Sequence, residues 1–116
     1  MASLSNLLPP GNLVTAAAPA TLTNKTITEM VSVISTNTTA VPSTVYVLTA
    51  SLTLTLPAAP AVGSWVRISN MSGTATAVVA RNGLNIMGLA EDMTIDRLSA
   101  GLTLEYADAT RGWIIL

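Results

Sequence analysis

The side chains able to carry out chemistry are few in this chain of 116 residues, because the sequence contains no histidine and no cysteine. General acid–base catalysis near neutral pH would depend on six carboxylates, one lysine and two tyrosines, and a nucleophilic serine or threonine would need one of these groups beside it as a base. The absence of cysteine also excludes disulfides and thiol chemistry. We therefore expect a protein that is not an enzyme and that carries no cofactor.

Three carboxylates, Glu91, Asp92 and Asp96, lie close together in the sequence and are the best candidates for a metal site. They lack the ladder of Asp, Asn and Gly residues that a dedicated calcium-binding loop uses, so a solvated turn is the favoured interpretation. Gly83 and Gly88 match no nucleotide-binding motif, since no lysine and no predicted helix follows them. The sequence therefore predicts neither a metal centre nor a phosphate-binding loop.

Charged residues make up 9% of the chain and hydrophobic residues 50%, and the formal net charge is −1. Soluble domains usually carry about 25% charged residues, so this surface has few charges with which to face water. The low charge also excludes a basic footprint for nucleic acid and a polybasic membrane patch. Residues 1–24 and 30–66 contain no charge at all. We expect neither nucleic acid nor a membrane as a partner, and we expect neutral contacts over the first half of the chain.

The longest uncharged region does not have the pattern of a membrane span. Residues 44–62 are interrupted by Pro57 and Pro60 and by frequent Thr and Ser, whereas a spanning helix needs about 20 predominantly apolar residues. The first residues also lack the basic region of a secretory signal. Synthesis in the cytoplasm is the corresponding expectation.

From residue 25 onward, the hydrophobic pattern has the period of two that is typical of β-strands. Residues 52–56 alternate Leu and Thr, which places Leu52, Leu54 and Leu56 on one face. Asn82-Gly83 is a strong hairpin signal, because both residues tolerate the positive φ of a type I′ turn. One helical turn is possible over residues 88–93. Further strands are predicted at residues 28–36, 45–48, 65–69, 75–80, 93–96, 102–106 and 113–116.

This succession of short strands predicts an all-β fold, a compact sandwich or small barrel of short antiparallel strands. The fold would occupy residues 25–116 as a single β domain. Residues 1–24 would form an extended N-terminal arm, because Pro9-Pro10-Gly11 and Ala18-Pro19-Ala20 favour extended or turn conformations. A leucine-rich arm left in water is a liability, so we expect it to dock on a neighbouring subunit or a larger assembly. The alternative is an arm wrapped on its own domain.

Trp65 and Trp113 each begin an apolar strand after a turn that contains glycine. Packing in the core or at a subunit interface is the favoured role for both, and a platform for a stacked ligand is the alternative. The outward positions of the predicted strands are mostly Thr, Ser and Ala, which leaves sheet edges without charged residues to guard them. We expect such edges to pair with another copy of the chain. The candidate interface residues are Leu52, Leu54, Leu56, Trp65 and Trp113.

A series of turn and strand residues follows in a characteristic order between residues 52 and 113. Its parts are Leu54-Thr55-Leu56-Pro57, Pro60, Gly63, Ala80-Arg81-Asn82-Gly83, Asn85-Ile86, Gly88, Ala90-Glu91-Asp92, Thr94-Ile95-Asp96, Leu104, Tyr106-Ala107-Asp108-Ala109-Thr110 and Gly112-Trp113. This order resembles that of virion proteins of tailed bacteriophages, which include tail-fibre, head-fibre and capsid decoration proteins. The resemblance implies a β-structured module that assembles on a virion, usually as a homotrimer. It transfers no catalytic residue.

The short length, without shaft repeats, favours a capsid decoration (cement) protein over a receptor-binding fibre. Its expected place is the capsid surface of the virion, and its expected partners are other copies of itself and the major capsid protein. The arm residues expected to contact the capsid are Leu4, Leu7, Leu8, Pro9, Pro10, Leu13 and Val14. One alternative is a small tail-fibre or head-fibre adaptor. Another is a carbohydrate-binding role at the host surface, with residues 70–73 and 81–88 and the two tryptophans forming the site.

Overall fold

The computed structural model describes residues 29–116, and this part of the chain consists of β-strands, turns and loops without a helix. The all-β prediction is thereby confirmed, whereas the helical turn expected over residues 88–93 is replaced by turns and an isolated bridge. Among these residues no helix exists that could cross a membrane. The strands are β1 (Met30–Ile34), β2 (Thr38–Thr39), β3 (Thr44–Leu48), β4 (Thr53–Thr55), β5 (Trp65–Asn70), β6 (Ala77–Ala80), β7 (Met93–Ile95), β8 (Gly101–Asp108) and β9 (Gly112–Ile115).

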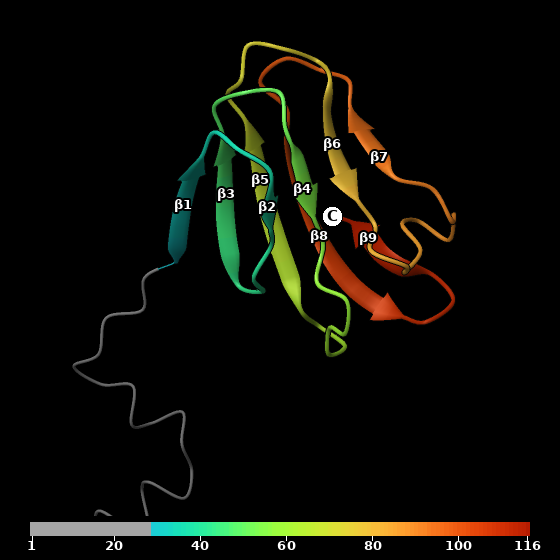
Figure 1. Cartoon of the computed structure of the whole chain (residues 1–116). Helices are drawn as coiled ribbons and strands as arrows, with labels where there is room; N and C mark the ends of the chain where they lie inside the picture. Colours follow the sequence, from blue (N-terminus) through green and yellow to red (C-terminus); the bar gives the residue numbers. More distant parts are fainter. Residues whose placement is uncertain (1–28) are drawn as a thin grey trace, which may run out of the picture.

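The strands form two mixed sheets, one with the order β1-β3-β5-β8-β9 and the other with the order β2-β4-β6-β7. From β1 to β6 the chain alternates between the sheets, and each strand lies parallel to the one before it in its own sheet. The chain therefore winds through successive rungs of two strands (Figure 1). The last three strands then pair antiparallel with their neighbours.

The prediction of antiparallel strands was wrong for the first six strands. Alternating Leu and Thr residues indicate which side chains share a face, but they carry no information about which strand lies alongside. The connections at residues 49–52 and 56–64 carry the chain across to the opposite sheet, so they do not reverse it beside the strand just completed. Pairing within each sheet is consequently between strands that are distant in sequence.

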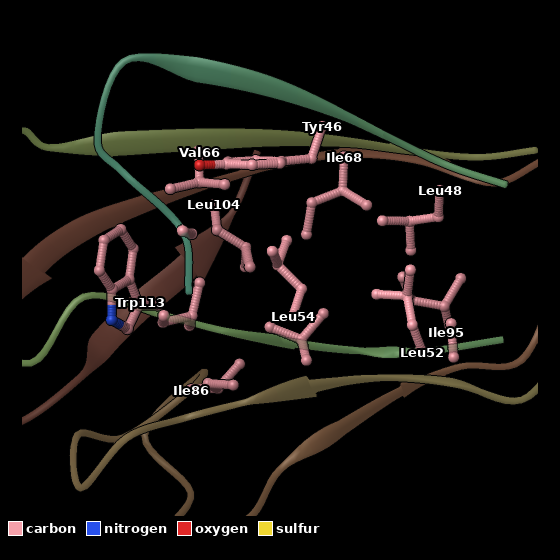
Figure 2. Close-up of a cluster of buried hydrophobic side chains, with 14 residues drawn as sticks. Tyr46, Leu48, Leu52, Leu54, Val66, Ile68, Ile86, Ile95, Leu104 and Trp113 are labelled. Atoms are coloured by element: carbon pink, nitrogen blue, oxygen red, sulfur yellow. The ribbon is translucent and has the colours of Figure 1, made fainter. Parts of the chain in front are cut away.

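The hydrophobic core lies between the two sheets (Figure 2). Strand β3 turns Tyr46 and Leu48 toward it, and β5 turns Val66 and Ile68, because alternate side chains of a strand point to the same face. The opposite sheet contributes Leu54, which is fully buried. The predicted shared face of residues 52, 54 and 56 is confirmed, since all three leucines are buried in this core.

The turn predicted at Asn82-Gly83 is present. Both residues have positive φ, 51° and 84°, and the N–H of Leu84 donates to the carbonyl of Arg81 at 3.2 Å. The turn does not join two paired strands directly, however. A second tight turn follows at residues 86–89, where Ile86 and Leu89 exchange two backbone hydrogen bonds of 3.0 Å. Together these turns form the long connection from β6 to β7.

The two sheets begin and end on the same sides of the molecule. The N-terminal strands β1 and β2 are the first strand of their respective sheets, and β9 and β7 are the last. Residues of β7 and β9 line the same surface hollow, which places these two edges next to each other. The described chain therefore starts at the side of the sheets formed by β1 and β2. The edges of β7 and β9 lie next to each other at the opposite side.

Candidate functional site

Four of the five predicted interface residues lie inside the core of the chain itself. Leu54, Leu56 and Trp113 are 0% exposed and Leu52 is 6% exposed. Their side chains leave no surface for a second subunit, so the structure assigns them to packing within the chain. The alternation of residues 52–56 was correctly interpreted as one buried face, but that face belongs to the chain's own core.

Trp65 is the one predicted interface residue that keeps part of its side chain accessible. The guanidinium of Arg67 lies 5.4 Å from the centre of its ring, an arrangement typical of a cation–π contact. Arg67 Nη1 also donates to both carboxylate oxygens of Glu29, at 3.0 and 3.1 Å. Arg67, paired with Glu29, therefore lies over the Trp65 ring, which keeps part of its surface accessible.

Trp113 is held in the core by a close approach of two segments at residue 112. Gly112 has a φ of 70°, and a Cβ atom there would overlap the backbone carbonyl of Asn85. The N–H of Trp113 donates to that carbonyl at 2.8 Å, and its own carbonyl accepts from the N–H of Met87 at 2.7 Å. Its ring meets that of Tyr106 edge-on, with 5.6 Å between centroids. The β6–β7 connection is thereby fastened to β9.

Several polar and acidic side chains of the described region bond to the backbone of turns and connections. Within residues 29–116, no group of three or more acidic side chains is placed to hold a metal ion. Asp92 instead accepts a hydrogen bond from the N–H of Arg81 at 2.9 Å. The hydroxyl of Tyr46 accepts one from the N–H of Val41 at 2.7 Å. These groups stabilise turns and connections.

The carboxyl group of Asp108 has a pKa below its usual value. The pKa is lowered chiefly because the backbone N–H of Arg111 donates to Oδ1 at 2.6 Å. The guanidinium of Arg111 and the N–H of Thr110 also favour the ionised form. The side chain is 41% exposed at the β8–β9 turn, and these hydrogen bonds stabilise that turn.

The loops considered for carbohydrate binding use their polar groups internally. Asn70 is fully buried, and its amide donates to the carbonyls of Thr74 and Arg97 at 2.8 and 3.0 Å. Asn82 donates to the carbonyl of Leu56, and Asn85 to that of Thr110, both at 2.9 Å. The amides in these loops therefore connect segments of the chain, which leaves fewer of them to bind a sugar.

Large hydrophobic side chains are exposed at both sides of the two sheets. On the first side, the edge strand β1 exposes Met30, Val31 and Val33, which are 69%, 59% and 66% accessible. Among the described strands, β1 pairs with β3 alone. No lysine, proline or bulge guards its other edge. This edge is a template to which a further strand could pair.

The second exposed apolar region is a groove along the seam between β7 and β9, which we call the β7–β9 groove. It consists of two adjoining hollows of about 210 and 140 Å³ that share Met93 and Ile115. Its lining residues are Ile86, Met87, Leu89, Glu91, Asp92, Met93, Thr94, Ile95, Asp96, Arg97, Ala100, Leu102 and Ile115.

The sequence analysis missed the β7–β9 groove because its apolar residues come from turns and short edges. Met87 and Leu89 fall between two turn signals, and no periodic pattern links them to Ile115. One signal in the sequence pointed to this groove. Met87-Gly88 occupies a turn in which Asn-Gly is the usual pair, so an apolar residue stands where a polar one is expected. The predicted capsid-contacting arm, residues 4–14, lies outside the residues that the structure describes.

Comparison of the sequence with models of protein families and with curated proteins finds no match.

Proposed function

We propose that the two-sheet module is a small β-sandwich that acts as a non-enzymatic capsid decoration (cement) protein of a tailed bacteriophage. It binds the assembled head as a homotrimer and stabilises it. The observation that carries this proposal is the exposure of large hydrophobic side chains at both sides of the sheets in a chain with 9% charged residues. Monomeric proteins rarely expose extended apolar patches, and such patches commonly mark protein–protein contacts.

The distribution of apolar surface over the described region supports a role in assembly. In the described region the module has a closed core, and accessible apolar surface lies at a strand edge and at a groove. Burying apolar surface contributes about 25 cal/mol per Å², and backbone groups at an open edge gain partners when a second strand pairs with them. Both contributions favour association with protein.

The mechanism is stabilisation by mass action. A protein that binds the assembled shell and not its separated subunits lowers the free energy of the shell by an amount that grows with occupancy. The arm supplies the contact with the major capsid protein in this proposal, through Leu4, Leu7, Leu8, Pro9, Pro10, Leu13 and Val14. These residues are uncharged, so the contact is apolar and insensitive to salt.

The direct test is the thermal rupture of phage heads that lack the protein, measured with and without saturating full-length chain. We expect rupture to move to higher temperature, and we expect a chain that begins at Thr21 to lose most of this effect. Unchanged rupture with the full chain would contradict the proposal. Binding of labelled protein to bare host cells, without binding to heads, would instead favour the fibre or adaptor role with a surface carbohydrate as the ligand.

A further inference from the structure

The β7–β9 groove contains a methionine in a left-handed backbone conformation, at the tight turn of residues 86–89. Met87 has a left-handed φ of 52°, a conformation that costs a residue with a side chain and that Asn or Gly adopts more easily. Its N–H donates to the Trp113 carbonyl at 2.7 Å and its Sδ accepts from the Ile115 N–H at 3.2 Å, yet the residue remains 54% exposed. A strained residue that also exposes an apolar side chain indicates a functional constraint.

The groove around Met87 combines an apolar lining with a negatively charged rim. Leu89 and Ile115 are 58% and 43% exposed beside it, and methionine side chains adapt readily to a bound surface. The carboxylates of Glu91 and Asp92 line the same hollow. A matching ligand would be a short extended segment with apolar side chains and a cation.

The chain itself contains a segment with this chemistry. Residues 22–27 have the sequence Leu-Thr-Asn-Lys-Thr-Ile, in which Leu22 and Ile27 flank Lys25. Lys25 is the only positively charged side chain in the first 66 residues. The segment therefore complements the groove in both hydrophobicity and charge.

The position at which the described chain starts keeps Ile27 of this segment from reaching the groove of its own chain. Cα atoms of consecutive residues are about 3.8 Å apart, so Ile27 lies within about 8 Å of Glu29. Glu29 directly precedes β1 and bonds to Arg67 on β5. Four strand spacings separate β1 from β9 in the five-stranded sheet, a distance of about 19 Å. Ile27 can reach the groove of a copy placed beside β1, but not the groove of its own chain.

We propose that residues 22–27 of one copy dock in the β7–β9 groove of a neighbouring copy, with Lys25 facing Glu91 and Asp92. The contact joins the β1 side of one copy to the β7–β9 groove of the next copy. Such head-to-tail contacts generate a closed ring when the rotation between copies permits. The inference rests on the self-association in the proposed function, and it is independent of capsid binding.

Charge reversal tests the pairing in the full-length chain. Lys25→Glu and Glu91→Lys should each weaken self-association about three- to tenfold, measured by light scattering across a concentration series, because each places like charges together. The double variant should restore association. Unchanged association in both single variants, or a double variant no better than either, would overturn the proposal, as would a wild-type chain that is monomeric at all concentrations.

A substitution at Met87 separates assembly from folding. Met87→Asn should change the thermal unfolding temperature of the dilute chain little, since asparagine suits the left-handed backbone better but the contact of the Met87 Sδ with the Ile115 N–H is lost. It should weaken self-association severalfold. Met71→Asn is the matched control, because Met71 is 61% exposed on a turn outside the groove. Equal effects of the two substitutions on association would contradict a role for the groove.

The absence of native cysteine allows a direct test of contact between copies. A chain with Lys25→Cys is mixed with a chain with Glu91→Cys and oxidised, and we expect a covalent dimer of the two under non-reducing conditions. Neither chain should form this mixed product with a Met71→Cys partner. Failure to form it would overturn the docking proposal, whereas co-sedimentation of the uncrosslinked chain with phage heads would still report separately on the proposed function.

Discussion

At the scale of single residues, burial separates the side chains that stabilise the chain from those that are available to a partner. Leu54 and Trp113 have no exposed surface, whereas Met87 and Leu89 expose more than half of theirs. The two groups are equally hydrophobic, so composition alone does not distinguish them. Their positions relative to the two sheets decide which of them pack within the chain.

Truncation of Leu54 should measure the contribution of the shared core. We expect Leu54→Ala to lower the free energy of unfolding by about 3 kcal/mol, since it removes buried methyl groups and leaves a cavity between the sheets. The control is Leu98→Ala, at a side chain that is 63% exposed, which should change it by less than about 0.5 kcal/mol. Chemical denaturation followed by tryptophan fluorescence measures both, and equal losses would show that the assigned core is wrong.

The Asp108 carboxylate should make the stability of the β8–β9 turn depend on pH. Its pKa is lower in the folded chain than the usual 3.8, mainly through the hydrogen bond from the Arg111 N–H. The stabilisation is therefore complete above the unfolded pKa and is lost as the pH falls through the lower folded pKa. We expect wild type to unfold at higher temperature than Asp108→Asn at pH 7, and the difference to shrink below about pH 4. A difference that is constant from pH 7 to pH 2.5 would argue against this role of the ionised form.

At the scale of elements, the close approach of the β6–β7 connection to β9 depends on a missing side chain. Gly112→Ala should cost more than about 2 kcal/mol of unfolding free energy, because the new Cβ meets the Asn85 carbonyl in addition to the strain of positive φ. Gly73→Ala is the control for strain alone: its φ is 74°, and open space surrounds the position of its Cβ. We expect a cost of about 1 kcal/mol there. Similar costs in thermal or chemical denaturation would mean that the approach to Asn85 does not constrain Gly112.

Comparison of the predicted strands with the observed ones shows how far the sequence could predict the fold. Period-two alternation located the strands near residues 45–48, 52–56 and 65–69 because each has one buried face. It could not locate β2, whose two threonines are too short for any period. It also could not show that β3 lies parallel to both β1 and β5, because alternation is the same in either direction. Partner and direction depend on the crossings between sheets, which the turn residues alone do not specify.

The candidate site was less predictable than the fold. The predicted interface at residues 52, 54 and 56 was inferred from apolar alternation, which a core strand and an interface strand share. The β7–β9 groove is assembled from Met87 and Leu89 in a turn, Met93 on a short strand and Ile115 near the last residue. These residues become neighbours only through the pairing of distant strands, so no local sequence pattern predicts that they lie together.

At the scale of the whole molecule, the low charge and the open edges have one physical explanation. Structures built from successive rungs need a cap at each end, because a terminal rung exposes unpaired backbone and apolar side chains. The antiparallel strands β7 to β9 follow the last rung, whereas β1 is the first strand of its sheet among the described residues. Because only 9% of the residues of the chain are charged, we propose that much of its surface is covered by other protein.

Co-sedimentation with intact phage heads tests the central claim most directly. Full-length protein is added to heads that lack it, the heads are pelleted, and the bound and free chain are quantified over a range of concentrations. We predict saturable binding to assembled heads and none to the unassembled major capsid protein, with binding reduced at least about tenfold for a chain that begins at Thr21. A full-length chain that stays in the supernatant at every concentration would contradict the account.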